Sequence, residues 1–291
     1  MLRYDPRDLV LALAWSPDGK VLAVAAGENV HLVDALTLQE LRLLPVGAWA
    51  VSLDYSPDGA LLALAAKDGI VQLWDAATGQ LRCKLEAHHP SGKSVDFSPD
   101  GRWLASTGSD AYVRLWDVSA IPQDGECDLS PAAEMIGAVF SVPSAVFSPD
   151  GTVIASVDGT MILLREVASQ RLVRTLHAQA PIFSLAYSPD GNLLASAEMG
   201  NTIHIWGVAS GEILQTLSRP GLPNEFMASV AFNPSGSLLI SGSSDGSVSL
   251  WDPLSGVYLR PVALSKLAVT DVVFSPNGMP ATKDLSMRCV P

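Results

Sequence analysis

The stretch Gly242-Ser243-Ser244-Asp245-Gly246 matches the Gly-x-Ser-x-Gly pattern that carries the nucleophile of many serine hydrolases. In that motif the serine stands on a sharp turn between a strand and a helix, so a helix has to follow it. The residues that follow here, Val248–Trp251, form a short apolar run typical of a strand. The stretch therefore predicts a turn between two strands, and the match to a nucleophile motif is coincidental.

His88, Ser106 and Asp110 supply the residue types of a Ser-His-Asp triad. A triad also needs an oxyanion hole and a cleft, and a buried serine hydroxyl without them is expected to be structural. His88-His89 is the only histidine pair, and adjacent residues of an extended chain point to opposite sides. The sequence has no glycine-rich phosphate loop, Cys-x-x-Cys or His-Glu-x-x-His. We expect no catalytic site, no metal and no cofactor.

The elements that carry these residues belong to a repeat of about 42 residues. In each copy an apolar run ends in an aromatic residue, a Ser-Pro-Asp-Gly-like turn follows, and a second apolar run leads away. Proline, aspartate and glycine favour successive positions of a tight turn, so each copy predicts a β-hairpin. The aromatic residues before the seven turns are Trp15, Tyr55, Phe97, Phe147, Tyr187, Phe232 and Phe274.

A third run closes several copies with the same three residues, as in Leu73-Trp74-Asp75, Leu115-Trp116-Asp117 and Leu250-Trp251-Asp252. With these endings the chain resembles the WD-repeat family over essentially its whole length. The Ser-Pro-Asp-Gly hairpin alone would also fit the propellers of periplasmic translocation proteins and prolyl oligopeptidases, but the Leu-Trp-Asp endings favour WD repeats. The resemblance implies an all-β fold: one domain over residues 1–291, a seven-bladed β-propeller of four-stranded antiparallel blades.

Two segments depart from the regular repeat. The last copy, residues 271–291, is short, and Met1–Tyr4 resembles its missing outer strand. We expect the N-terminal strand to complete the last blade, with a truncated chain as the alternative. The other departure, residues 119–131, is expected to be an inserted polar surface loop, with an acidic docking loop as the alternative.

The family resemblance implies a second role for the triad-like residues. His88 lies where WD repeats keep a histidine before the first strand, and with Ser106, Asp110 and Trp116 it resembles the structural tetrad of the family. Such a chain of hydrogen bonds satisfies buried polar groups inside a blade. The other repeats lack this histidine, so the tetrad is expected in one blade alone.

Composition limits the partners. The formal net charge is −12 and the pI about 4.7, which argues against nucleic acid, and no apolar run approaches the ~18 residues of a membrane span. The three cysteines show neither metal spacing nor a disulfide framework. We expect a cytoplasmic protein that is monomeric by itself.

The resemblance also implies a binding face. If the four strands of a repeat are lettered a to d in chain order, family members commonly bind partners on the face that carries the d–a loops between repeats and the b–c loops within them. Aromatic and acidic residues predicted on that face are Trp49, Phe226, Phe183, His89, Phe140, Asp68, Asp245 and Glu198. Trp49 and Phe226 are the leading candidates, and the alternative for each aromatic is packing between blades or in the channel. The sequence thus favours a non-catalytic scaffold that binds a peptide or protein, expected to be basic. A sensor propeller split from a kinase or nucleotide-switch protein is the alternative, followed by an enzyme propeller.

Overall fold

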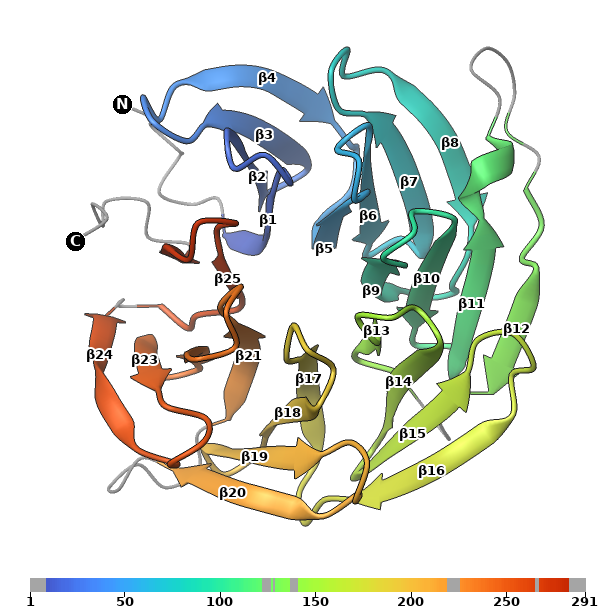
Figure 1. Cartoon of the computed structure of the whole chain (residues 1–291). Helices are drawn as coiled ribbons and strands as arrows, with labels where there is room; N and C mark the ends of the chain where they lie inside the picture. Colours follow the sequence, from blue (N-terminus) through green and yellow to red (C-terminus); the bar gives the residue numbers. More distant parts are fainter. Residues whose placement is uncertain are drawn as a thin grey trace. The chain divides into compact units, whose positions relative to one another are not determined.

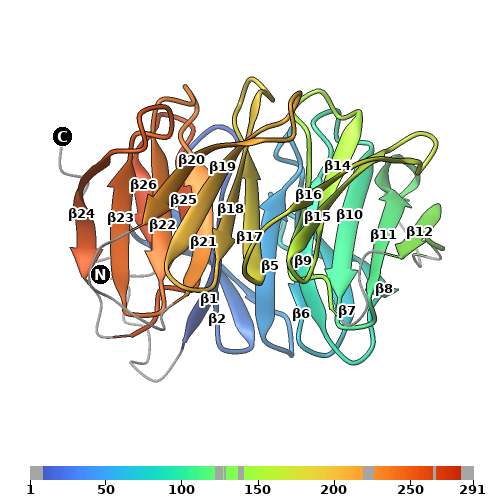
Figure 2. The ribbon, with the colours of Figure 1, turned by 90° about the horizontal axis from the view of Figure 1, so that it is seen from below.

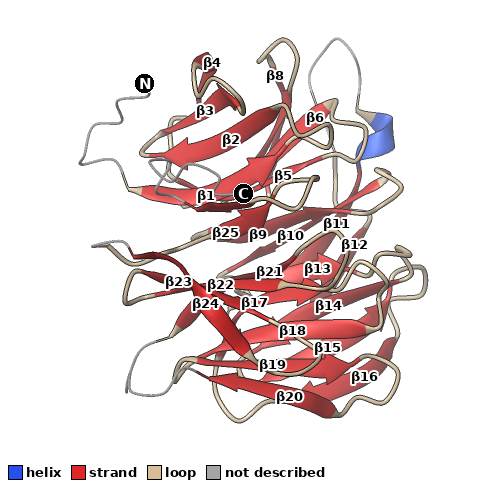
Figure 3. Cartoon of the chain, turned by 60° about the vertical axis from the view of Figure 1, so that its left-hand side comes forward, coloured by secondary structure: helices blue, strands red, loops and turns tan. Residues whose placement is uncertain are grey.

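The computed structural model describes residues 9–121, 127, 129–136, 141–218, 226–264 and 267–282. In this part of the chain, β-strands are joined by turns and loops, and a single 3-10 turn, Val118–Ala120, is its helical element (Figure 3). Among these residues no helix has the length and apolar character needed to cross a membrane. The chain divides into two compact units, residues 1–147 and 148–291, and each is described by itself. A single domain over 1–291 stays a prediction.

Three four-stranded antiparallel sheets lie in the first unit, and we call them blades 1 to 3 (Figure 1). Blade 1 comprises β1 (Val10–Trp15), β2 (Val21–Ala26), β3 (Asn29–Asp34) and β4 (Glu40–Pro45). Blade 2 comprises β5 (Ala50–Tyr55), β6 (Leu61–Ala66), β7 (Ile70–Asp75) and β8 (Leu81–Glu86). Blade 3 comprises β9 (Gly92–Phe97), β10 (Trp103–Gly108), β11 (Tyr112–Asp117) and β12 (Ala133–Ile136). Strands that follow one another in the chain pair within each blade, as Figure 2 shows for β5, β6 and β7.

The following repeats build blades 4 to 6 with the same strand order. Blade 4 comprises β13 (Ala145–Phe147), β14 (Val153–Asp158), β15 (Met161–Glu166) and β16 (Leu172–His177). Blade 5 comprises β17 (Ile182–Tyr187), β18 (Leu193–Glu198), β19 (Thr202–Gly207) and β20 (Ile213–Ser218). Blade 6 comprises β21 (Met227–Phe232), β22 (Leu239–Ser243), β23 (Ser247–Trp251) and β24 (Tyr258–Leu264).

The prediction of seven four-stranded blades is wrong, because the described residues form six. The seventh repeat contributes a two-stranded hairpin, β25 (Val272–Phe274) and β26 (Pro280–Thr282). Each of its strands has three residues, and Pro280 has no N–H to donate to a strand ladder. The Ser-Pro-Asp-Gly-like turn that marks a repeat specifies only its first hairpin, so seven turns did not require seven complete blades. The predicted closing strand at the N-terminus lies outside the described residues.

The Ser-Pro-Asp-Gly turns share one set of hydrogen bonds. In blade 2, Ser56 Oγ donates to Asp58 Oδ1 (2.6 Å) and accepts from Leu61 N–H (2.9 Å), while Asp58 Oδ1 accepts from Ala60 N–H. Gly59 follows with a φ of 73°, which glycine adopts without steric cost. These bonds lower the pKa of Asp58 and fix the angle between the first two strands.

Polar side chains on the innermost strands join neighbouring blades of the first unit. Asp54 Oδ2 on β5 accepts from Phe97 N–H of β9 (2.7 Å), and Asp96 Oδ2 accepts from Phe147 N–H (2.6 Å). Ser52 Oγ likewise accepts from Val95 N–H (3.1 Å). These acceptors satisfy backbone donors that the strand's own sheet leaves unpaired.

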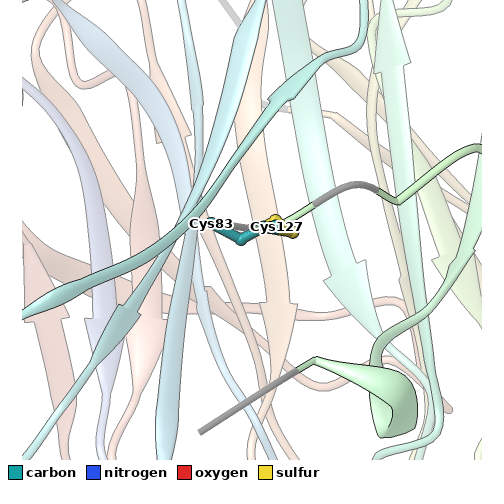
Figure 4. Close-up of a disulfide and its surroundings, with 2 residues drawn as sticks. All are labelled: Cys83 and Cys127. Carbon is teal, nitrogen blue, oxygen red and sulfur yellow. A yellow bond between two sulfur atoms is a disulfide. The ribbon is translucent and has the colours of Figure 1, made fainter. Parts of the chain in front are cut away.

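Three described residues of the segment predicted as a polar surface loop, residues 119–131, pack against the core of blades 2 and 3. They are Ile121, Cys127 and Leu129. Cys127 forms a disulfide with Cys83 on β8, with their Cα atoms 5.1 Å apart (Figure 4). Two of the three cysteines, whose spacing in the sequence indicated no disulfide framework, are therefore paired. The two cysteines are 44 residues apart in sequence, and only the stacking of blade 3 on blade 2 brings them together.

Candidate partner-binding surface

The structure brings together the four residues of the predicted tetrad inside blade 3. His88 Nδ1 lies 2.8 Å from Asp110 Oδ1, and His88 Nε2 lies 2.8 Å from Ser106 Oγ. Trp116 Nε1 donates to the same Ser106 oxygen at 2.9 Å. Because the carboxylate can only accept, Nδ1 carries the proton, and Ser106 donates to Nε2.

Burial lowers the pKa of His88, although Asp110 opposes this shift, so the ring is neutral near pH 7. Burial by itself would raise the pKa of Asp110, but hydrogen bonds from Arg114 and His88 hold it below its ordinary value. Ser106 is fully buried, with its proton directed to His88 and a lone pair to Trp116. A substrate has no route to this hydroxyl, so these four residues stabilise the blade.

A second buried network lies in blade 5, built without the loop histidine that defines the tetrad of blade 3. Ser196 Oγ donates to Glu198 Oε1 (2.7 Å), which also lies 2.8 Å from His204 Nδ1. Trp206 Nε1 donates to Ser196 Oγ (2.9 Å). The imidazole comes from strand β19 instead of the loop before the first strand, which is why a search for the loop histidine misses it.

One sequence signal could have found these networks, namely a serine ten residues before the tryptophan of the third strand. Ser196–Trp206 and Ser241–Trp251 share this spacing with the tetrad of blade 3, and Trp251 Nε1 donates to Ser241 Oγ (2.9 Å). In blade 2 the acceptor is Gln72, whose Oε1 accepts from the indole N–H of that blade's third-strand tryptophan (3.0 Å).

Glu198 was predicted as an acidic contact on the surface, but the structure buries it, with 1% of its side chain exposed. It belongs to the network of blade 5 and cannot contribute a contact at the surface. Asp68 is exposed in the turn between β6 and β7, where its Oδ1 accepts from Ile70 N–H. Asp245 is half-buried in the corresponding turn of blade 6, where its Oδ1 accepts from Ser247 N–H.

The aromatic candidates of the first unit lie in the loops before the first strands of blades 2 and 3. Trp49 is half-buried, and Lys67 Nζ lies 4.5 Å from the centre of its ring. The Trp49 carbonyl accepts from Lys67 N–H, which holds the two residues side by side. His89 is exposed. Phe140 lies outside the described residues.

In the second unit, two of the predicted aromatic residues form a cluster with a methionine that the sequence did not single out. The rings of Phe183 and Phe226 lie 4.8 Å apart between centroids, with an interplanar angle of 37°. Met199 pairs with Phe226 as an isolated β-bridge, so the methionine and the aromatic rings lie at one edge of blades 5 and 6. Met199 is 49% exposed and Phe226 37% exposed. We call these three residues the Phe-Met cluster.

The Phe-Met cluster is held by the backbone around it. Ser244 Oγ accepts from Phe226 N–H at 3.1 Å, and the Phe226 carbonyl accepts from Ser244 N–H. This reciprocal pair fixes the segment before β21 against the turn between β22 and β23. An exposed apolar cluster on a fixed backbone can bind an apolar side chain with little loss of conformational freedom.

Among the described residues, no group of three or more His, Cys, Asp or Glu side chains is placed to hold a metal ion. No curated protein matches the chain. The family model of the IFT122 first beta-propeller matches residues 49–284, which is most of the chain. WD40-type propeller domains of this kind are typically non-catalytic. The described residues form six four-stranded blades and a buried tetrad, and the chain belongs to the family of the IFT122 first beta-propeller, a WD40-type propeller.

Proposed function

We propose that this WD40-type propeller binds a protein or peptide partner through the edge of its blades that carries the d–a and b–c loops. Propeller domains of this type are generally protein-interaction scaffolds. The observation that supports the location is the Phe-Met cluster, where Phe183, Phe226 and Met199 expose apolar surface at one edge of blades 5 and 6. Aromatic side chains and methionine are enriched at interfaces, where they contribute much of the binding energy.

We further propose that the partner segment is basic. The chain carries a formal net charge of −12, and Asp68 and Asp245 lie in b–c turns on the same edge of their blades as the aromatic candidates. A surface of this sign raises the association rate of a cationic segment and loses this effect as salt is added. Lys67 beside Trp49 makes the first unit less acidic at that point, so Asp245 and the Phe-Met cluster are expected to contribute more.

Changing Phe226 to Ser tests the location. Loss of a central aromatic contact is expected to weaken binding of a partner captured by the wild-type chain by at least ~2 kcal/mol, or about thirtyfold. Leu254→Ser is the matched control, because Leu254 is 69% exposed in the turn between β23 and β24, at the opposite edge of blade 6. Equal binding by both variants and the wild type would rule out the Phe-Met cluster as the binding site.

Charge reversal tests the chemistry of the partner. Asp245→Lys and Asp68→Lys are expected to weaken binding at low salt and to reduce its salt dependence, as measured by titration at two sodium chloride concentrations. If binding to the captured partner is insensitive both to salt and to these substitutions, the partner is not recognised through its positive charge.

A further inference from the structure

A pocket of about 640 Å³ lies between blades 1 and 2, at the edge of these blades that carries the turns after β1, β5 and β7. Its apolar wall comes from Val21 and Leu32 of blade 1 and from Tyr55 and Ala76 of blade 2. The charged side chains that line it are Arg42, Asp18 and Asp58, and Asp18 is paired with Lys20 (3.0 Å). Leu41 on the outer strand β4 also lines it and is 56% exposed. We call this pocket the first groove.

At the equivalent position between blades 2 and 3, which we call the second groove, three described residues of the inserted segment pack against the core. The wall of the second groove consists of the residues equivalent to those of the first groove, which are Leu61, Leu73, Phe97 and Val118. Ile121, Cys127 and Leu129 of the inserted segment after β11 pack against the buried cluster that contains Leu73, Phe97 and Val118, as does Leu61. This repeat protein therefore shows what its inter-blade groove accepts, namely a peptide segment with bulky aliphatic side chains.

One position on the outer strand of a blade is where such a segment is attached. In blade 2, Cys83 pairs with Leu73 across the strands and forms the disulfide with Cys127 of the inserted segment. In blade 1 the residue at this register position is Arg42, which pairs with Leu32. The position of Cys83, which anchors the inserted segment covalently in the second groove, is thus occupied by the guanidinium-bearing Arg42 in the first groove.

Side chains at this register position also donate hydrogen bonds to backbone carbonyls of the next blade. Arg42 Nη2 donates to the carbonyl of Ala77 (3.0 Å) in the following turn, and Gln215 Nε2 donates to the carbonyl of Leu254 (2.9 Å). Arg174 on β16 donates in the same way to the carbonyl of Ala209 (3.1 Å). A guanidinium has five N–H donors, so Arg42 can hold the Ala77 carbonyl and still bind a carboxylate.

We propose that the first groove binds a short extended segment of a partner protein, which places two bulky aliphatic side chains against Val21, Leu32 and Leu41 and a carboxylate against Arg42. A second copy of this chain is a poorer occupant, because its inserted segment is already seated in its own second groove by the Cys83–Cys127 disulfide. The site is distinct from the edge considered under the proposed function, so either can fail without the other.

The probe is a fluorescent, terminally blocked peptide that copies residues 119–131, with Cys127 changed to Glu and the other acids changed to Ser. It keeps the aliphatic residues that fit the second groove, and its remaining Glu can reach Arg42. Binding is measured by fluorescence anisotropy with the disulfide intact, and saturable binding with a dissociation constant on the order of 100 μM is expected. A peptide in which Ile121 and Leu129 are also changed to Ser is expected not to bind.

Leu41→Ser is expected to weaken binding of the probe roughly five- to tenfold, because it removes an apolar side chain from the groove. Leu43→Ser, on the same strand and 46% exposed, is the matched control and is expected to bind like the wild type. Arg42→Gln is expected to weaken binding of the Glu probe, but not of a probe with Gln at that position. Both leucines are exposed, so neither substitution is expected to affect folding.

Three outcomes would overturn the proposal. They are the absence of saturable binding, equal effects of Leu41→Ser and Leu43→Ser, and a concentration-dependent dimer of the wild type that Leu41→Ser dissociates. The last result would mean that a second copy covers the first groove.

Discussion

Replacing Gly108 by alanine tests the packing that keeps the tetrad of blade 3 in place. A Cβ atom on Gly108 would overlap Cβ and Cγ of His88 and lie 2.7 Å from its Nδ1. Since Gly108 sits on strand β10 with an ordinary backbone conformation, the effect is steric and does not come from backbone strain. The imidazole has to leave its position, and its hydrogen bonds to Asp110 and Ser106 are lost.

The expected cost follows from those groups. Each buried polar group that loses its partner costs about 1–3 kcal/mol, and two such losses give roughly 3–4 kcal/mol because Asp110 keeps Arg114 and Ser106 keeps Trp116. A change of this size is expected to lower the melting temperature by on the order of 8 °C. The melting temperature is measured by circular dichroism or calorimetry.

A double-mutant cycle with His88→Gly identifies the cause. His88→Gly removes the Cβ that alanine at 108 would overlap, so Gly108→Ala is expected to cost little in that background. If the two changes are additive, or if Gly108→Ala leaves the melting temperature unchanged, the close approach of Gly108 to His88 does not limit the stability of blade 3.

Three further predictions concern other groups inside the blades. Desolvation raises the pKa of Asp54 to about 7, so between about pH 4 and 7 the folded chain binds more protons than the unfolded chain and loses stability as the pH rises. Asp54→Asn is expected to stabilise the chain at pH 8 and to have little effect at pH 4. An unchanged pH dependence of urea unfolding would contradict this. Reducing the Cys83–Cys127 disulfide, or changing Cys127 to Ser, is expected to cost about 2–4 kcal/mol; the unreduced, denatured chain should show one free thiol, and three free thiols would refute the pairing. Ser196→Ala is expected to cost about 1–3 kcal/mol in urea unfolding because Trp206 loses its acceptor, and no loss would mean that the network of blade 5 is not stabilising.

Much of the fold could be predicted because its signals are local. The turn of Ser56, Asp58 and Gly59 closes within a few residues, so the sequence pattern alone specifies the hairpin. The number of complete blades does not follow from such local signals, because it depends on the strands that come after each first hairpin. The turn that ends at Gly278 resembles the other turns, yet the strands on either side of it have three residues each.

The arrangement of the candidate residues could be predicted where they occupy the same position in the repeat as in other WD repeats. It could not be predicted where the hydrogen-bond or disulfide partners come from other positions or other blades. His88 occupies a position that the repeat defines, and its partners follow. Glu198 was predicted to lie at the surface because of its place in a turn, but its carboxylate is buried and hydrogen-bonded to Ser196 and His204 inside the blade. The Cys83–Cys127 disulfide depends on contact between blades, which no pattern within one repeat reports.

The most direct test of partner binding through the Phe-Met cluster is site-specific photo-crosslinking. A photoreactive phenylalanine analogue at position 226 is expected to crosslink to the partner that the wild-type chain captures, while the same analogue at position 254 is not. Crosslinking from position 254 alone, or equally from both positions, would contradict binding at the edge of blades 5 and 6 that carries Phe183, Phe226 and Met199.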